Sequence, residues 1–219
     1  SPVLTLVQDA NVVAVSLNQS ENGVNANLSI NIRATDLHTG INVSSFSLSE
    51  VSGSNRLYDA AGTTFTVNGD TFTVNTQVTN TGVVGTETIQ VSVSVEDNAG
   101  NLSSIEIPIN ITIIDDVAPV ISIVNSPTDV NVYSSNNRLQ AVNVIFTVTD
   151  TSEVIPVEQV VVTETSSGDV AVATDVQSVI KSETNYTLPI IVNAQALGHN
   201  QTETLTYVIV AQDSVGNSS

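Results

Sequence analysis

The stretch LSINIRATD, residues 28–36, places apolar side chains at every second position and then an aspartate, Asp36, in the same phase. The pattern recurs as IQVSVSVED at 89–97, VNVIFTVTD at 142–150 and LTYVIVAQD at 205–213. Side chains of a β-strand alternate between its two faces, so each stretch predicts a strand with one buried face. Unless a bulge intervenes in the last pleats, the closing aspartates should also point inward. These aspartates are Asp36, Asp97, Asp150 and Asp213.

The rest of the chain follows the same plan. Short runs rich in Val, Ile and Thr recur about every ten to fifteen residues between clusters of Gly, Asn, Asp and Ser, and helical periodicity is nearly absent. This pattern predicts an all-β fold built of antiparallel β-sandwiches. Asn68-Gly69 predicts a two-residue hairpin turn, and helical turns are expected only at 175–183 and 194–197. Strands are predicted at 3–7, 28–35, 45–51, 64–67, 71–77, 88–96, 104–114, 120–124, 142–149, 157–164, 170–173, 186–192 and 205–212.

An internal repeat divides the chain. SPVLTLV at 1–7 resembles APVISIV at 118–124, and TETI at 86–89 resembles TETL at 202–205. A spacing of about 115 residues suits one immunoglobulin-like sandwich per repeat. The sequence therefore predicts two tandem immunoglobulin-like domains, residues 1–116 and 117–219.

The two repeats differ after their last shared motif. DNAGN at 97–101 is followed by a further long apolar-alternating run, whereas little sequence follows DSVGN at 213–217. The second domain is therefore expected to lack its final strand. A sheet edge left open in this way favours strand exchange with a neighbour.

Composition excludes several classes of function. The chain has 4 Lys and Arg residues against 22 Asp and Glu, a formal net charge of −18, so we expect no nucleic-acid partner and no binding to anionic membranes. No apolar run is long enough to span a bilayer, so membrane insertion is not expected. The absence of cysteine excludes disulfides and thiolate sites. Stabilisation by ions instead of disulfides is compatible with an extracellular location, at a cell surface or secreted.

The inward aspartates need a positive partner, because a buried unpaired carboxylate is costly. Four basic residues are too few to neutralise clusters of carboxylates in both domains. Carboxylate, amide and main-chain oxygens suit a hard cation such as Ca²⁺. The alternative is that an aspartate in Asp-x-x-Gly-Asn only forms a turn by accepting bonds from its own backbone.

The expected strand order places the metal. In an immunoglobulin-like domain the second and sixth strands lie in opposite sheets, so their aspartate ends meet at the pole where the chain enters. The chain enters the second domain through Asp115 and Asp116, which should therefore approach Asp150 and Asp213 and bind calcium with them. Asp36 and Asp97 lie at the equivalent pole of the first domain. An acidic linker to that pole would precede Ser1, so this site is expected to be incomplete.

The sequence contains no catalytic constellation, and we expect no enzymatic activity. His38 and His199 are single histidines in polar loops and are expected to be solvated. Serines and acids have no neighbouring base in the sequence that would activate a nucleophile. Glu21 could reach the domain junction, but a solvated loop acid is the simpler interpretation.

The motifs DNAGN and DSVGN, together with the linker DDVAPVI at 115–121, resemble the tandem immunoglobulin-like, cadherin-like repeats of large calcium-dependent bacterial surface adhesins. This resemblance implies a cell-adhesion stalk whose repeats contact neighbouring repeats of the same chain and are made rigid by interdomain calcium. The implied linker ligands are Asp115 and Asp116. The implied loop ligands are Asp150 and Asp213, with Asp36 and Asp97 serving the preceding junction.

Two functions remain open from the sequence. The first is a structural spacer that projects a distant adhesive tip. The second is a glycan- or protein-binding accessory module of a secreted enzyme. Aromatic residues make up only 4% of the chain and tryptophan is absent, which disfavours sugar stacking. Many adjacent copies in the parent gene would favour the spacer, and a single pair beside a catalytic domain would favour the accessory module.

Overall fold

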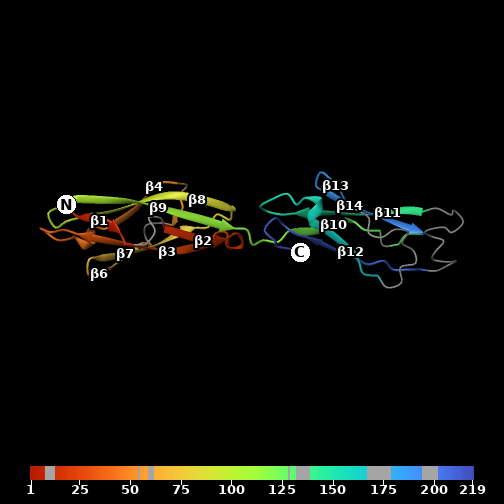
Figure 1. Cartoon of the computed structure of the whole chain (residues 1–219), viewed down its shortest axis with the longest axis horizontal. Coiled ribbons are helices and arrows are strands. Elements are labelled where there is room, and N and C mark those ends of the chain that lie inside the picture. The colour runs from red at the N-terminus through yellow and green to blue at the C-terminus, as the bar shows by residue number, and fades with distance from the viewer. Residues whose placement is uncertain are drawn as a thin grey trace. The chain divides into compact units, whose positions relative to one another are not determined.

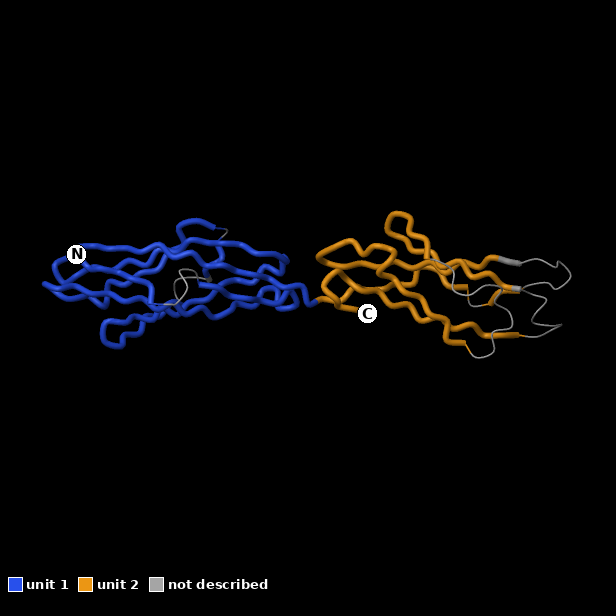
Figure 2. The backbone as a smooth tube through the Cα atoms, viewed as in Figure 1, with its two compact units in different colours: residues 1–116 blue, residues 117–219 orange. Residues whose placement is uncertain are grey.

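The chain divides into two compact units. The computed structural model describes residues 1–7, 13–53, 55–58, 62–127, 129–131, 139–166, 179–193 and 202–219. Unit 1 comprises Ser1–Asp116 and unit 2 comprises Val117–Ser219, coloured blue and orange in Figure 2. The described residues form β-strands and short 3-10 helices, without an α-helix. The prediction of an all-β fold of tandem sandwiches is therefore confirmed.

Unit 1 is a sandwich of two sheets whose strands run along its length (Figure 1). The first sheet has the order β1 (Val3–Leu6), β3 (Asn25–Thr35), β7 (Thr71–Thr79) and β5 (Leu57–Tyr58), and β6 (Thr64–Asn68) also pairs with β7. The second sheet has the order β2 (Val13–Asn18), β9 (Leu102–Ile114), β8 (Gly85–Glu96) and β4 (Ser47–Ser52). The 3-10 helices are η1 (Gln19–Glu21) and η2 (Val43–Ser45).

The core of unit 1 is made by the alternating apolar residues. Ile30 on β3, Val91 on β8 and Ile109 on β9 are fully buried. Phe46 stacks on Phe72 with ring centroids 4.3 Å apart. The two sheets are thus joined by branched aliphatic side chains, which suit a pleated, half-buried surface.

The outer faces of unit 1 carry paired polar side chains. On the first sheet the Ser29 hydroxyl donates to Oδ1 of Asn75 at 2.7 Å. On the second sheet the Thr88 hydroxyl donates to Oδ1 of Asn110 at 2.7 Å. The two residues of each pair stand directly opposite one another in the strand register, so each pair adds a cross-strand interaction to the backbone ladder.

Unit 2 repeats the plan. Its first sheet has the order β10 (Val120–Asn125), β11 (Leu139–Thr149), β14 (Asn185–Asn193) and β13 (Ile180–Ser182). The second sheet, among the described residues, pairs β12 (Val160–Glu164) with β15 (Tyr207–Ala211), and η5 (Val157–Gln159) precedes β12. The core contains Phe146 and Tyr186, whose rings stack with centroids 5.6 Å apart. The Tyr186 hydroxyl donates to the Ile155 carbonyl, and Lys181 Nζ donates to the same oxygen at 2.6 Å.

Several local predictions need correction. The hairpin turn is one residue later than expected: Asn68 still pairs with Thr71, and Gly69-Asp70 form the turn, with positive φ at Gly69. Strands β2 and β5 were not predicted. The helical turn expected at 175–183 is wrong where the structure describes it, because Ile180–Ser182 form β13. The predicted strand at 170–173 and the turn at 194–197 lie outside the described residues.

Candidate functional site

The strand-end aspartates face inward, as the alternation predicts. Asp36 follows β3 in the first sheet of unit 1, and Asp97 follows β8 in the second sheet. Their side chains are only 3% and 2% exposed. In unit 2, Asp213 follows β15 and is 3% exposed, and Oδ2 of Asp150, which follows β11, is buried. No bulge has turned these carboxylates to the solvent.

Asp36 holds the loop that follows it. Its Oδ1 accepts backbone hydrogen bonds from His38 at 2.9 Å, Thr39 at 2.7 Å and Gly40 at 3.1 Å. These donors, Thr39 and His38 foremost, hold the pKa of Asp36 far below its usual range. The carboxylate is therefore charged at neutral pH, and its Oδ1 acts as the turn former.

Asp97 makes the equivalent bonds in the opposite sheet. Its Oδ1 accepts from the backbone N–H groups of Ala99 at 2.9 Å and Asn101 at 2.8 Å, and the Asn101 amide donates to Oδ2 at 2.7 Å. The Asn101 side chain, followed by its backbone, lowers the pKa of Asp97. The motif DNAGN thus closes a loop around one carboxylate.

The Ser1 nitrogen lies beside both carboxylates of unit 1. The Ser1 amino nitrogen is 3.7 Å from Oδ2 of Asp36 and 3.7 Å from Oδ2 of Asp97. The two loops are also joined, since the Asn98 backbone donates to the Gly40 carbonyl at 3.0 Å. Oδ2 of each aspartate is therefore turned toward the same place, the Ser1 nitrogen.

Unit 2 repeats the loop around Asp213. Oδ1 accepts from the backbone of Val215 at 3.0 Å, Gly216 at 2.6 Å and Asn217 at 2.8 Å, and the Asn217 amide donates to Oδ2 at 2.7 Å. Burial by itself raises the pKa of Asp213, but the bonds from Asn217, Gly216 and Val215 outweigh it and leave the pKa below its usual value.

Asp150 differs from the other strand-end aspartates in the surroundings of one carboxylate oxygen, Oδ2. Its Oδ1 accepts from the Ser152 backbone at 2.8 Å, the Ser152 hydroxyl at 2.7 Å and the Glu153 backbone at 3.2 Å. Its Oδ2 is buried and accepts no hydrogen bond from any described residue. Glu153 in turn accepts from the Ser214 backbone, which fastens this loop to that of Asp213. The unsatisfied oxygen fits a bound cation, because a buried carboxylate oxygen without a partner is costly.

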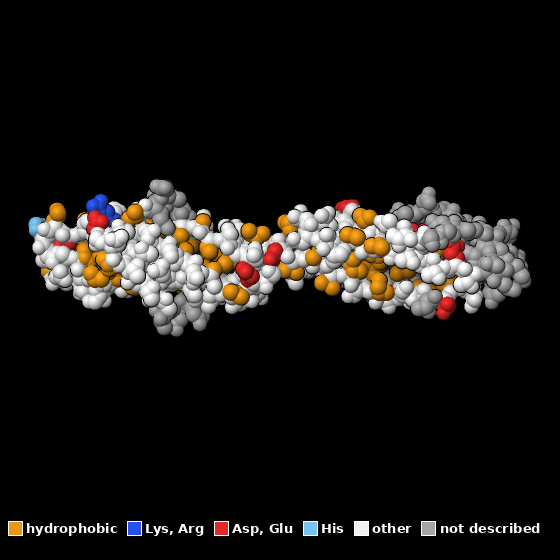
Figure 3. Space-filling view, turned by 90° about the horizontal axis from the view of Figure 1, so that it is seen from below, with side chains coloured by type: hydrophobic (Ala, Val, Ile, Leu, Met, Phe, Trp, Pro, Cys, Tyr) orange, Lys and Arg blue, Asp and Glu red, His pale blue; other side chains and the backbone are white. Residues whose placement is uncertain are grey.

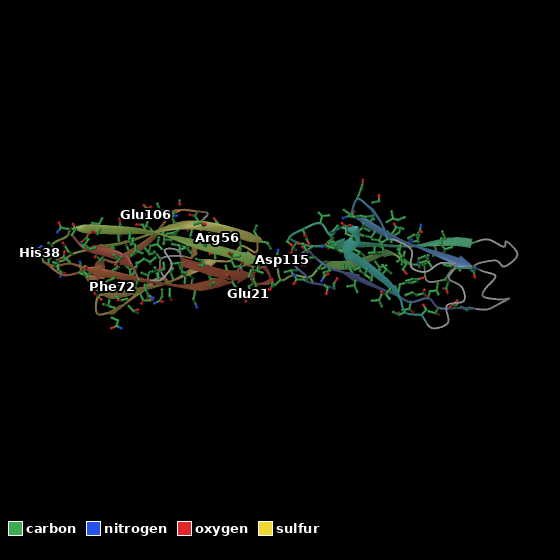
Figure 4. The ribbon with its side chains drawn as sticks, viewed as in Figure 1. Glu21, His38, Arg56, Phe72, Glu106 and Asp115 are labelled. Atoms are coloured by element: carbon green, nitrogen blue, oxygen red, sulfur yellow. The ribbon has the colours of Figure 1, made fainter. Side chains whose placement is uncertain are left out.

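The linker aspartates end unit 1, at the pole opposite to Asp36. Figure 4 shows Glu21 and Asp115 at one end of the unit and the exposed His38 at the other. The Ser20 backbone donates to Oδ1 of Asp116 at 2.8 Å, and the Ser20 hydroxyl donates to Oδ2. These bonds, that of the hydroxyl first, lower the pKa of Asp116. Sequence reasoning missed Ser20, because nothing in the local pattern marks a partner that far along the chain. The predicted His199 lies outside the described residues.

The acidic side chains of the described residues form no larger cluster. No group of three or more His, Cys, Asp or Glu side chains there is arranged to hold a metal. In unit 1 two predicted ligands, Asp36 and Asp97, each lie 3.7 Å from the Ser1 nitrogen. In unit 2 the loops of Asp150 and Asp213 are joined by the bond from the Ser214 backbone to Glu153. A calcium ion, which takes about six to eight oxygens, would need carbonyl, amide or water oxygens besides them.

No helix in the described part of the chain has the length and apolar character to cross a bilayer.

Comparisons with known proteins bear on the fold. No protein-family model matches the sequence, and no curated protein matches it. Among solved structures, a protocadherin gammaB7 EC3-6 cis-dimer structure aligns with 99% of this chain and 45% of its own, at 19% identity and a TM-score of 0.50. The protocadherin gamma B7 extracellular cadherin domains 1-4 align with 100% and 48%, at 17% identity and 0.49. Titin domains z1z2 in complex with telethonin align with 98% and 93%, at 14% identity and 0.36.

The chain thus spans slightly less than half the length of the protocadherin chains that it matches. The match to the EC3-6 structure extends over both units. Together with the sheet order of each unit, it shows that the chain has a tandem cadherin-like, immunoglobulin-like β-sandwich fold.

Proposed function

We propose that this chain is a structural spacer repeat of a bacterial cell-surface adhesin, made rigid by calcium at the junction between its two units. The tandem sandwiches support a spacer, since each unit has a separate core and the outer faces of unit 1 carry paired polar side chains. The chain is extracellular and has no enzymatic activity. Its partners are neighbouring repeats, with strand exchange possible at the edge of unit 2.

One observation carries the calcium proposal: Oδ2 of Asp150 is buried without a hydrogen bond from any described residue. In unit 1 the corresponding oxygens of Asp36 and Asp97 both lie 3.7 Å from the Ser1 nitrogen. Turn formation and metal binding are therefore compatible roles of one carboxylate. In Asp150, Oδ1 holds the loop and Oδ2 remains available to a cation. Oδ2 of Asp97 and of Asp213 each also accept one bond from an asparagine amide.

The mechanism follows from this division. Asp150 and Asp213 hold the ion at the entry pole of unit 2, next in sequence to Asp115 and Asp116. Asp36 and Asp97 form the equivalent pair in unit 1. Bound calcium supplies positive charge that relieves the repulsion between these carboxylates. Extracellular calcium modules bind with dissociation constants of about 0.1 to 1 mM, so the site would be filled outside a cell.

Calorimetric titration of the full chain with calcium tests the proposal. We expect saturable binding that Asp150→Asn and Asp213→Asn each weaken about tenfold or more, since each removes the charge of a ligand carboxylate. Asparagine keeps an oxygen that can accept the loop hydrogen bonds, so the fold should be retained. Asp129→Asn, a change at an exposed acid of unit 2, is the matched control and should bind calcium like the parent.

Small-angle scattering with calcium and with a chelator provides the mechanical readout. A more extended and less variable particle with calcium is expected. Absence of calcium binding, or an equal weakening of binding by Asp129→Asn, would contradict the calcium proposal. The four aspartates would then be turn formers only.

A further inference from the structure

The two strands of the β6–β7 hairpin begin with the same five residues. TFTVN at 64–68 is the whole of β6, and TFTVN at 71–75 is the first part of β7. Gly69 and Asp70 form the turn between them, with positive φ at Gly69. Strand β6 is therefore a copy of the segment with which it pairs.

Strand β6 is an edge strand of the first sheet of unit 1. Among the described residues it pairs only with β7, and Figure 1 shows it at the margin of the unit. Asn68 and Thr71 flank the two-residue turn, and a pair in this position exchanges both of its backbone hydrogen bonds. Bonded pairs alternate along an antiparallel ladder, so Phe65 and Val67 direct their backbone N–H and C=O groups away from β7. These groups form a row of donors and acceptors along the open edge.

The edge of β6 lacks the features that protect other edge strands of the described sheets. Strands β4 and β10 each pair with a register shift, which bends a strand. Strand β13 has only three residues, and one of them is Lys181. Strand β6 has five residues without a charge, a proline or a register shift, and four of them are Thr, Phe or Val, which favour an extended backbone. Such an edge favours pairing with a further strand.

The repeated sequence determines which strand fits this edge. Within the hairpin Thr66 pairs with Thr73, which is its own equivalent in the repeat. Phe65 pairs with Val74, which is the equivalent of Val67. Two copies of β6 can therefore pair antiparallel in the register of the hairpin, with Thr66 opposite Thr66 and Phe65 opposite Val67 of the other copy. Such a pair is self-complementary and closes on itself about a two-fold axis.

The side chains suit this pairing as well. Phe65 packs against the core of unit 1, with its ring centroid 5.6 Å from that of Phe46. Val67 lies in the same phase of the strand but is 45% exposed. In the pair of copies, Val67 of one copy lies beside Phe65 of the other, so the apolar face of the sheet continues across the axis and Val67 is covered.

We propose that β6 is a lateral self-association site, at which two copies of this chain pair their β6 edges antiparallel about a two-fold axis through Thr66. The pairing joins the first sheets of two copies of unit 1 into one continuous sheet. It concerns contacts between chains and requires no bound cation. It therefore goes beyond the proposed calcium-stiffened spacer, and either proposal can fail without the other.

Disulfide cross-linking of the full chain tests the register. Residue 66 lies on the axis, where opposite residues of a pair that is not hydrogen-bonded have Cα atoms about 4.5 Å apart, a separation that a disulfide can bridge. The natural sequence has no cysteine, so Thr66→Cys would place the only thiol of each chain opposite its equivalent. With oxidised glutathione, in chelator, we expect a disulfide-linked dimer.

Thr64→Cys is the matched control for the cross-link. Thr64 is also an exposed threonine and lies on the same face of β6 as Thr66. In the proposed register its two copies are four residues apart along the strands, or about 14 Å, which is too far for a disulfide. The dimer of Thr66→Cys should form about tenfold faster or more than that of Thr64→Cys. Equal rates would overturn the proposal.

Sedimentation of the cysteine-free chain tests the association itself. At about 0.15 M salt, which screens the repulsion between distant charges, the parent chain should show a monomer–dimer equilibrium that depends on protein concentration. Thr66→Lys and Thr66→Glu each place like charges opposite each other at the axis and should each raise the dissociation constant about fivefold. An equimolar mixture of the two variants places opposite charges there and should restore association at least to the parent level.

Ser49→Lys is the control for the change in charge. Ser49 is exposed on β4, the edge strand of the second sheet, so this variant should leave the dissociation constant within about 1.5-fold of the parent value. A parent chain that stays monomeric would overturn the proposal. So would a mixture of the two Thr66 variants that associates no better than either variant alone.

Discussion

Asp36, Asp97, Asp150 and Asp213 each use Oδ1 to accept hydrogen bonds from the loop that follows their strand. This explains why two interpretations of these residues fit the sequence equally well. The strand alternation correctly predicts that the side chains are buried, since it depends only on the backbone period. It could not predict that Oδ2 of Asp150 lacks a donor, because that depends on which loop atoms come near it.

The lowered pKa values predict a loss of stability in acid. Asp36, Asp97 and Asp213 have folded-state pKa values below the usual 3.8, so as the pH falls the unfolded chain takes up these protons first. Their contribution is complete above about pH 4 and is lost as the pH falls through the folded-state values. Urea unfolding between pH 7 and 2 measures this. Asp97→Asn should give a shallower loss, and a stability that is constant down to pH 2 would contradict the prediction.

At the scale of elements, strand bounds were predicted well where the alternation of apolar and polar residues was long. Strands β3, β8 and β9 were predicted to within three residues at each end, because each contributes at least four buried apolar positions. β2 was missed although Val13, Val15 and Leu17 alternate, since its partner β9 is distant in sequence and parallel to it. The hairpin turn was misplaced by one residue because cross-strand packing of β6 on β7 fixed the register.

Of the side chains on β9, those on its inward face should account for most of the strand's contribution to the stability of unit 1. Ile109→Ala removes a fully buried side chain and should lower the free energy of unfolding of unit 1 by about 2–5 kcal/mol. Ile114→Ala changes the same residue type on the same strand, but its side chain is 47% exposed and the cost should be within about 0.5 kcal/mol. Chemical denaturation measures both. Similar costs would show that the assigned inward face of β9 is wrong.

For the whole molecule, charge is the dominant property. A net charge of −18 on a chain with 4 basic residues repels itself, and burial of carboxylates at the strand ends adds to that repulsion. Each unit has its own hydrophobic core, so two unfolding transitions are expected. The excess of acids and the repeat were evident in the sequence. The pairing of Ser20 with Asp116 was not, because it depends on the folded arrangement of η1 and β9.

Calcium should stabilise unit 2 beyond the effect of ionic strength. For a dissociation constant of about 1 mM, 10 mM calcium adds about 1.4 kcal/mol to the free energy of unfolding. Hydrogen exchange in β11 and β14 reports on this unit directly. Sodium chloride of equal ionic strength should give a smaller shift, and Asp213→Asn should shrink the calcium-specific stabilisation to about 0.4 kcal/mol or less. Equal protection by both salts would mean that only general screening is at work.

Three basic side chains in the described part of the chain, Arg33, Arg56 and Lys181, lie where a digestive protease reaches them with difficulty. Arg33 lies within β3 and Lys181 within β13, so each is held in a paired strand. Arg56 is only 4% exposed, and its Nε lies 3.1 Å from Oε2 of Glu87 (its position is labelled in Figure 4). Acidic and apolar side chains dominate the coloured surface in Figure 3, with few basic ones. An enzyme that cleaves after lysine or arginine can cut at Arg33 and Lys181 only when their strands open, and at Arg56 only when its side chain becomes exposed, so cleavage at these three positions should be slow.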